Sequence, residues 1–197
     1  MSKRRGPYVA GREARRIILN AARDAFAERG FRGGVLRDVA ERAGVSAGNI
    51  IHHFGSKQGL LLALLEERDI GSNVHLHEPG GSFVDRLRDL VRRNAQDRSM
   101  VQLFATLAAE STDAEHPAHD FFRNRYTMVR DTVTTSVRTA QQQGALPEGL
   151  PAEQIAAGLI AVMDGLQTQW LLDPGFDMVA AFDGHLRAIG ALETRSV

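Results

Sequence analysis

The stretch Leu36–Lys57, which reads LRDVAERAGVSAGNIIHHFGSK, carries the strongest structural signal in the chain. Apolar residues at helical spacing predict a short helix that ends at Gly44 and a second short helix that ends at Gly55. Glycine can adopt the left-handed conformation that closes a helix without a steric cost. The stretch therefore predicts two short helices joined by a tight turn, an arrangement that places the second helix in the major groove of DNA.

The residues at the start of each helix support this interpretation. Ser46 is expected to cap the second helix, and Val45 and Ile50 are placed to form a hydrophobic staple. Ser56 is expected to cap the helix that follows, whose first turn contains Lys57. A lysine is unfavourable near the positive end of a helix dipole, and a bound phosphate would relieve this conflict. The alternative is an ordinary helical hairpin with a solvated face, but such a hairpin does not require these signals to agree.

The second short helix has one apolar face and one outward face. Ile50 and Phe54 are expected to lie on the buried face. The outward side chains are expected to be those of Ala47, Gly48, Asn49, Ile51, His52 and His53.

Charge is unevenly distributed along the chain. Residues 1–57 contain 12 Lys and Arg against 5 Asp and Glu, a net charge of +7. Residues 58–197 contain 12 against 19, a net charge of −7. The basic N-terminal part has the electrostatic character expected of a surface that binds phosphates.

Four segments of this basic part carry a family resemblance. They are FAERGF at 26–31, RDVA at 37–40, AGVSAG at 43–48 and HFGSK at 53–57. At these residues the chain resembles the TetR family of bacterial transcriptional regulators. The resemblance implies an all-α fold of about nine helices, with an N-terminal three-helix helix-turn-helix DNA-binding domain and a larger C-terminal helical domain for ligand binding and dimerisation. We expect these domains to span residues 1–57 and 58–197.

The resemblance also implies which residues contact double-stranded DNA. These are Arg37, Ala47, Gly48, Asn49, Ile51, His53 and Lys57. The chain departs from the family pattern at three positions, because Val35 replaces a Thr or Ser, and Ile51 and His53 each replace a common Tyr. We therefore expect a missing helix cap at Val35 and a missing hydroxyl donor to phosphate at Ile51.

Composition limits the remaining functional classes. The chain has 197 residues and no Cys, which excludes disulfides and thiolate metal sites and is typical of a reducing cytosol. Its basic N-terminus lacks the apolar segment of a secretory signal, and no run of about 18 consecutive apolar residues predicts a membrane span. We expect a cytoplasmic protein with no membrane partner and no cofactor.

The sequence pattern outside Leu36–Lys57 predicts further helices and one long loop. Residues 2–8 are expected to form a disordered basic arm, followed by a helix over about 12–29. A helix from Ser56 to about Asp69 precedes a loop over 71–82, which contains Gly71 and Pro79. The other helices are expected at about 85–96, 100–109, 118–143, 153–172 and 177–192.

The two C-terminal helices resemble the family's dimerisation surface. Candidate interface residues are Ile155, Leu159, Val179, Phe182, Leu186 and Ile189, although these faces could instead pack inside one copy. A homodimer would read two half-sites of a palindromic operator, about 34–36 Å apart. The family also encloses a small-molecule pocket. Candidate lining residues are Leu103, Phe104, Leu107, Phe122, Tyr126, Met163, Gln167 and Trp170.

Two alternative functions compete with that of a ligand-released repressor. A metal-dependent enzyme could use His75, His77 and Glu78, or His116 and His119, but exposed loop histidines explain both groups better, so no metal site is expected. Catalytic motifs such as a phosphate loop or a nucleophile elbow are absent from the sequence. A sequence-independent DNA-binding protein would lack a preferred operator, whereas a regulator prefers one by about 10³ or more over random DNA.

Overall fold

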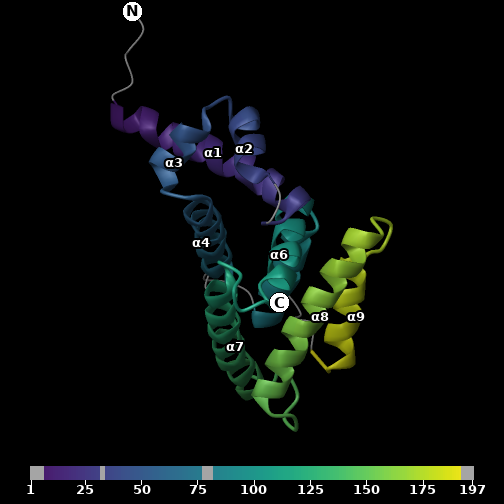
Figure 1. The fold of residues 1–197 in the computed structure, drawn as a ribbon. Coiled ribbons are helices and arrows are strands. Elements are labelled where there is room, and N and C mark those ends of the chain that lie inside the picture. Colours follow the sequence, from purple (N-terminus) through teal and green to yellow (C-terminus); the bar gives the residue numbers. More distant parts are fainter. Residues whose placement is uncertain (1–6, 32–33, 77–81, 192–197) are drawn as a thin grey trace, which may run out of the picture. The chain divides into compact units, whose positions relative to one another are not determined.

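The computed structural model describes residues 7–31, 34–76 and 82–191. These ranges contain nine α-helices and no strand, which confirms the predicted all-α fold (Figure 1). The helices are α1 (Pro7–Arg29), α2 (Val35–Ala43), α3 (Ala47–Phe54), α4 (Lys57–Leu76), α5 (Phe83–Asn94), α6 (Arg98–Glu110), α7 (His119–Gln142), α8 (Ala152–Leu172) and α9 (Met178–Ala188).

The chain packs as two compact units. The first comprises residues 1–69 and 102–119, and the second comprises residues 70–101 and 120–197. The division passes within α4 and within α6, so the units differ from the functional limits expected at residues 57 and 58. Those functional limits stay a prediction.

The first unit is built on α1, whose buried face is close to the predicted one. Ile18, Ala22, Ala25 and Phe26 are fully buried, whereas Ile17 is 40% exposed. The α1 helix begins at Pro7 rather than near residue 12, because proline is well suited to the first position of a helix. The rest of the predicted basic arm, residues 2–6, lies outside the described residues.

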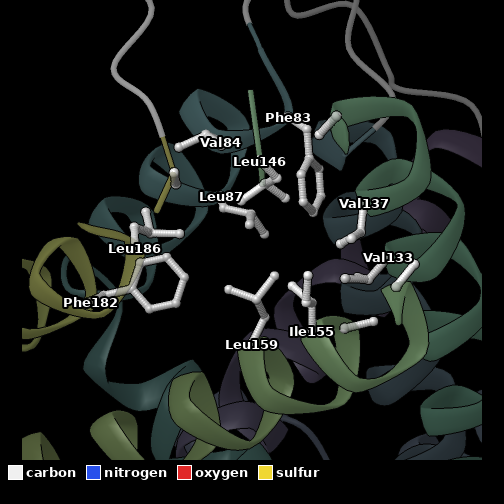
Figure 2. Close-up of a cluster of buried hydrophobic side chains, with 14 of the residues drawn as sticks. Phe83, Val84, Leu87, Val133, Val137, Leu146, Ile155, Leu159, Phe182 and Leu186 are labelled. Atoms are coloured by element: carbon white, nitrogen blue, oxygen red, sulfur yellow. The ribbon is translucent and has the colours of Figure 1, made fainter. Parts of the chain in front are cut away.

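The second unit has one hydrophobic core, which α5, α7, α8 and α9 surround (Figure 2). The α5 helix begins with a full capping box, in which the Ser82 hydroxyl accepts from Asp85 N and the Asp85 carboxylate accepts from Ser82 N. Capping fixes the start of α5, and Val84 and Leu87 then point into the core. On the opposite sides Val133 of α7, Leu159 of α8 and Phe182 of α9 complete the packing. Figure 2 shows these side chains converging.

Two predicted helix ends are corrected. The α4 helix runs to Leu76, through part of the predicted loop at 71–82. One glycine inside a helix costs only about 1 kcal/mol, so Gly71 does not end it. The α9 helix ends at Ala188 rather than near residue 192, because Gly190 turns the chain with a φ of 77°.

The predicted dimer residues are also placed differently. Ile155, Leu159, Phe182 and Leu186 are at most 8% exposed and lie in the core of the second unit, where they cannot face another copy. Val179 and Ile189 are half-buried and pack against that core. The helical repeat shows which face of a helix is apolar, but the tertiary packing decides what covers that face.

The other face of α8 remains largely uncovered. In the described residues it is the one helix that is long and apolar enough to cross a membrane, by length and composition only, and 17% of its apolar window is buried. That criterion is weak evidence of a membrane span, since a helix that packs in a protein core can meet it as well. Ala157, Ala161, Gly165 and Leu172 lie on the exposed face, and Leu172 is 83% exposed.

Candidate DNA interface

The α3 helix is set by the residues that the sequence indicated. The Ser46 hydroxyl accepts a hydrogen bond from Asn49 N at 3.1 Å, as an N-cap should. Gly44 ends α2 with a φ of 65°, and Gly55 ends α3 with a φ of 75°. Ile50 is completely buried and fixes the helix on the first unit. The side chains on the opposite face of α3 are therefore presented outward.

The outward face of α3 is nearly the predicted one. Ala47, Gly48 and Asn49 are exposed, as are Ile51 and His52. Their small or short side chains leave room for the helix to approach base edges closely.

His53 differs from this outward group because it is half-buried. Its ring contacts the rings of both sequence neighbours, His52 and Phe54. Phe54 is also half-buried rather than fully enclosed, and the Arg15 guanidinium lies 4.7 Å from its ring centroid. The guanidinium therefore covers part of an aromatic face that α3 leaves open.

Ion pairs join α2 to the end of α1. Arg42 reaches Glu28 at 2.5 Å and Asp38 at 3.2 Å, and Arg29 reaches Asp38 at 3.0 Å. The hydrogen bond with Glu28 is the largest cause that raises the pKa of Arg42, and the same bond lowers the pKa of Glu28. These contacts lie at the surface and are individually weak, and they link α2 to the C-terminal end of α1.

Arg37 takes no part in this ion-pair cluster. Its side chain is exposed at the start of α2, and it forms no ion pair within the part of the chain that the structure describes. Val35, the first residue of α2, is fully buried. The N-cap residue of α2 is Gly34, which provides no side-chain cap. The missing cap agrees with the departure from the family pattern at Val35. Contact between Arg37 and DNA stays a prediction.

Lys57 lies at the start of α4, as expected, but it is already engaged inside the first unit. Its ammonium donates to Phe31 O at 2.8 Å and lies 4.1 Å from the centre of the Phe31 ring. The Ser56 hydroxyl caps α4 by accepting from Gly59 N at 2.9 Å. An ammonium carries three donors, so the bond to Phe31 leaves capacity for a phosphate.

Glu110 is a part of this region that the sequence did not reveal. Its carboxylate accepts from Phe31 N at 2.8 Å, although the two residues are 79 positions apart. The Glu110 side chain is 30% exposed and lies against the turn after α1. Only the packing of α6 could have identified it, since no local pattern marks it.

His116, in the turn between α6 and α7, and His119, the first residue of α7, are structural residues rather than exposed loop histidines. His116 is 7% exposed, and its Nδ1 lies 2.9 Å from the Ser111 hydroxyl. His119 Nδ1 lies 2.9 Å from Ser111 O. Within the described ranges no group of three or more His, Asp or Glu could hold a metal ion. His75 lies in α4 rather than a loop, whereas His77 and Glu78 lie outside the described residues.

The predicted effector residues fall in both units. Leu103, Phe104 and Leu107 are buried in the first unit. In the second unit Phe122 is buried, and Tyr126, Met163, Gln167 and Trp170 are half-buried. That these residues share one pocket stays a prediction.

Two of these candidate effector residues, Tyr126 and Trp170, already contact other side chains. The Tyr126 hydroxyl donates to the Asp164 carboxylate at 2.8 Å, and the Arg98 guanidinium lies 5.3 Å from the centre of the Trp170 indole. Arg98 also donates to Trp170 O and to Leu171 O, so it caps the end of α8. One face of the indole is therefore occupied by a cation.

Comparison with protein families covers most of the chain. The family described as "Bacterial regulatory proteins, tetR family" matches residues 18–64, and "BetI-type transcriptional repressor, C-terminal" matches residues 84–191. The first match contains α2, α3 and the start of α4, and the second contains α6 to α9 and nearly all of α5.

Individual relatives agree with these family matches. The transcriptional regulator BetI of Burkholderia thailandensis is 33% identical over 183 residues, which are 89% of this chain and 91% of that protein. The regulator TtgR of Pseudomonas putida is 30% identical over 177 residues, 82% of each protein. A transcriptional regulator from Saccharomonospora viridis, solved in complex with choline, superposes with a TM-score of 0.76 at 27% identity, covering 92% of this chain and 99% of that one. These proteins are regulators and not enzymes, which excludes the enzymatic alternative, and the chain belongs to the TetR family of bacterial transcriptional regulators.

Proposed function

We propose that this regulator is a cytoplasmic repressor that binds a palindromic operator as a homodimer and is released by a small apolar or amphipathic effector. The observation that carries the DNA-binding part is the exposed face of α3, which Ser46 caps and Ile50 anchors. The net charge of +7 on residues 1–57 supports contact with phosphates, and the net charge of −7 on the remainder keeps the rest of the chain from the duplex.

The α8 helix supports the homodimer. An apolar helix with 17% of its window buried exposes more apolar surface than a single copy can cover, and a second copy would bury it. Small residues at four-residue spacing on this face, Ala157, Ala161 and Gly165, would let two helices approach closely. Two copies related by a two-fold axis would place two α3 helices on successive turns of one DNA face.

The polar contacts in the second unit indicate which charge and polarity the effector would have. Arg98 covers one face of Trp170, and the Tyr126 hydroxyl already donates to Asp164. A cationic ligand would be repelled by Arg98, whereas an apolar ligand could pack beside the half-buried Met163 and Trp170. The Saccharomonospora viridis protein is solved with choline, which supports a small-molecule effector for this architecture. Because choline is a cation, we expect the effector of this chain to differ from it.

Release would follow from a shift in population. An effector that binds better to a state whose two α3 helices no longer match the groove spacing weakens operator binding. The coupling is reciprocal, so the operator must weaken effector binding by the same factor. Titrating choline and a neutral apolar compound while following the single Trp170 fluorescence, with and without operator, measures this factor.

The DNA-binding proposal is tested by selecting bound fragments from genomic DNA and measuring affinity for the recovered site. A palindrome preferred by about 10³ over a scrambled duplex is expected. N49A should change which bases are preferred, whereas N20A, the same change at an exposed position of α1, should not. Equal affinity for both duplexes would instead support sequence-independent binding.

A further inference from the structure

Phe31 is held by residues from three separate segments of the first unit. Its N–H donates to the Glu110 carboxylate at 2.8 Å, and its carbonyl accepts from the Lys57 ammonium at 2.8 Å. The ring has the Lys57 ammonium 4.1 Å from its centre and the His116 ring edge-on at 5.2 Å. We refer to Phe31, Lys57, Glu110 and His116 as the Phe31 clasp.

The residue before Phe31 shows how closely Glu110 approaches the backbone. Gly30 has a φ of 61°, and a Cβ built on it would lie 2.2 Å from Glu110 Oε1. The carboxylate therefore occupies the space that a side chain at position 30 would need. The left-handed backbone favours glycine there, and a side chain at this position would force the Glu110 carboxylate to move.

Glu110 is in turn supported by the turn that follows α6. Its Oε2 lies 3.5 Å from His116 Nε2, and His116 Nδ1 lies within hydrogen-bonding distance of the Ser111 hydroxyl and of Ala118 N. The His116 side chain is 3% exposed. The clasp is therefore a connected and partly buried set of contacts, in which His116 is buried and the other three residues are half-buried.

We propose that Glu110 is a positioning residue for DNA binding, which acts by fixing Phe31 so that Phe31 can hold the Lys57 ammonium at the first turn of α4. This inference rests on the proposed role of Lys57 as a phosphate contact. A free lysine has many rotamers and loses them on binding. Orienting the ammonium before DNA arrives reduces that loss, and the N–H groups at the start of α4 add to the same anion site.

A purely structural role for Glu110 makes different predictions. If the carboxylate only stabilises the first unit, removing it lowers the melting temperature and leaves the number of phosphate contacts unchanged. If it positions Lys57, removing it also reduces the salt dependence of binding, since that slope falls by about 0.9 for each lost phosphate contact. The salt slope therefore separates the two roles.

The test compares E110A with E110Q, which carry the same charge. The Gln oxygen can still accept from Phe31 N, whereas Ala cannot, so the pair isolates the hydrogen bond from the loss of a negative charge near DNA. Affinity for the selected operator is measured by fluorescence anisotropy between 50 and 200 mM salt. E115A, which removes an exposed carboxylate from the same turn, is the control.

E110Q and E115A are expected to bind with the wild-type salt slope. For E110A we expect operator affinity at 100 mM salt to fall roughly 10- to 100-fold, and its loss between 50 and 200 mM salt to become roughly 10-fold smaller, as for a dimer that loses two contacts. E110D keeps the charge with a side chain one methylene shorter, and it should behave like E110A. If circular dichroism shows that E110A does not fold, E110D takes its place in the test.

A double mutant completes the test. K57A should show the same reduced slope, and K57A combined with E110A should bind no worse than K57A alone, because both changes remove one contact. Equal binding by E110A and E110Q, an unchanged slope in K57A, or additive losses in the double mutant would overturn the proposal. Failure of wild-type protein to prefer the operator would instead overturn the proposed function.

Discussion

The surroundings of Tyr126 raise the pKa of its hydroxyl. Burial is the main cause that raises its pKa to about 12, and the Asp164 charge and hydrogen bond act in the same direction. Because the folded-state pKa lies above the ordinary value of 10.0, the stabilising contribution is complete below pH 10 and is lost as the pH rises toward 12. At neutral pH the hydroxyl is therefore a permanent donor to Asp164.

Tyrosinate absorbance gives a direct check on this perturbed hydroxyl. The chain has two tyrosines, Tyr8 and Tyr126, and we expect Y126F to remove a step near pH 12 from the titration of the folded protein. Y8F should leave that step in place. A wild-type titration without a step near pH 12 would contradict the hydrogen bond between Tyr126 and Asp164.

Individual residues also show where local sequence is sufficient. Ser46, Ser56, Gly44 and Gly55 act as predicted, because each cap involves atoms no more than four residues apart. Glu110 could not be predicted in the same way, since its partner Phe31 is distant in sequence.

Among the helices, α8 depends on a side chain from another helix for its C-terminal end. Arg98 donates to Trp170 O at 3.2 Å and to Leu171 O at 2.6 Å, and thereby satisfies two carbonyls that have no partner within the helix. The same guanidinium covers the indole. Arg98 therefore holds the end of α8 by two kinds of contact at once.

Replacing Arg98 tests that contact. R98A should destabilise the protein by about 1 kcal/mol, a modest value because the contact is exposed, which corresponds to roughly 2–4 °C in melting temperature. It should also shift the emission of the single tryptophan. R92A, which breaks only an exposed pair with Asp89, should change both quantities little. If R98A and R92A behaved alike, Arg98 would have no role in holding α8.

At the scale of the whole molecule, the exposed face of α8 is the proposed dimer surface. Ala161 lies at the middle of that face, and A161E would bury a charge in the proposed interface. We expect light scattering after size-exclusion chromatography to show a monomer for A161E and a dimer for A114E, the same change in the exposed turn after α6. Operator affinity should fall with the dimer, because one α3 alone contacts too few bases. A dimeric A161E would place the interface elsewhere.

The sequence by itself determined the helical class, the capped helix-turn-helix and the separation of basic and acidic parts. These features depend on neighbouring residues or on simple composition, so local spacing is enough to read them. Only the tertiary structure decided that Ile155, Leu159, Phe182 and Leu186 belong to a core rather than an outer face, and that Glu110 reaches Phe31. A helical repeat reveals an apolar face but not its partner, and a contact across 79 residues exists only once helices have packed.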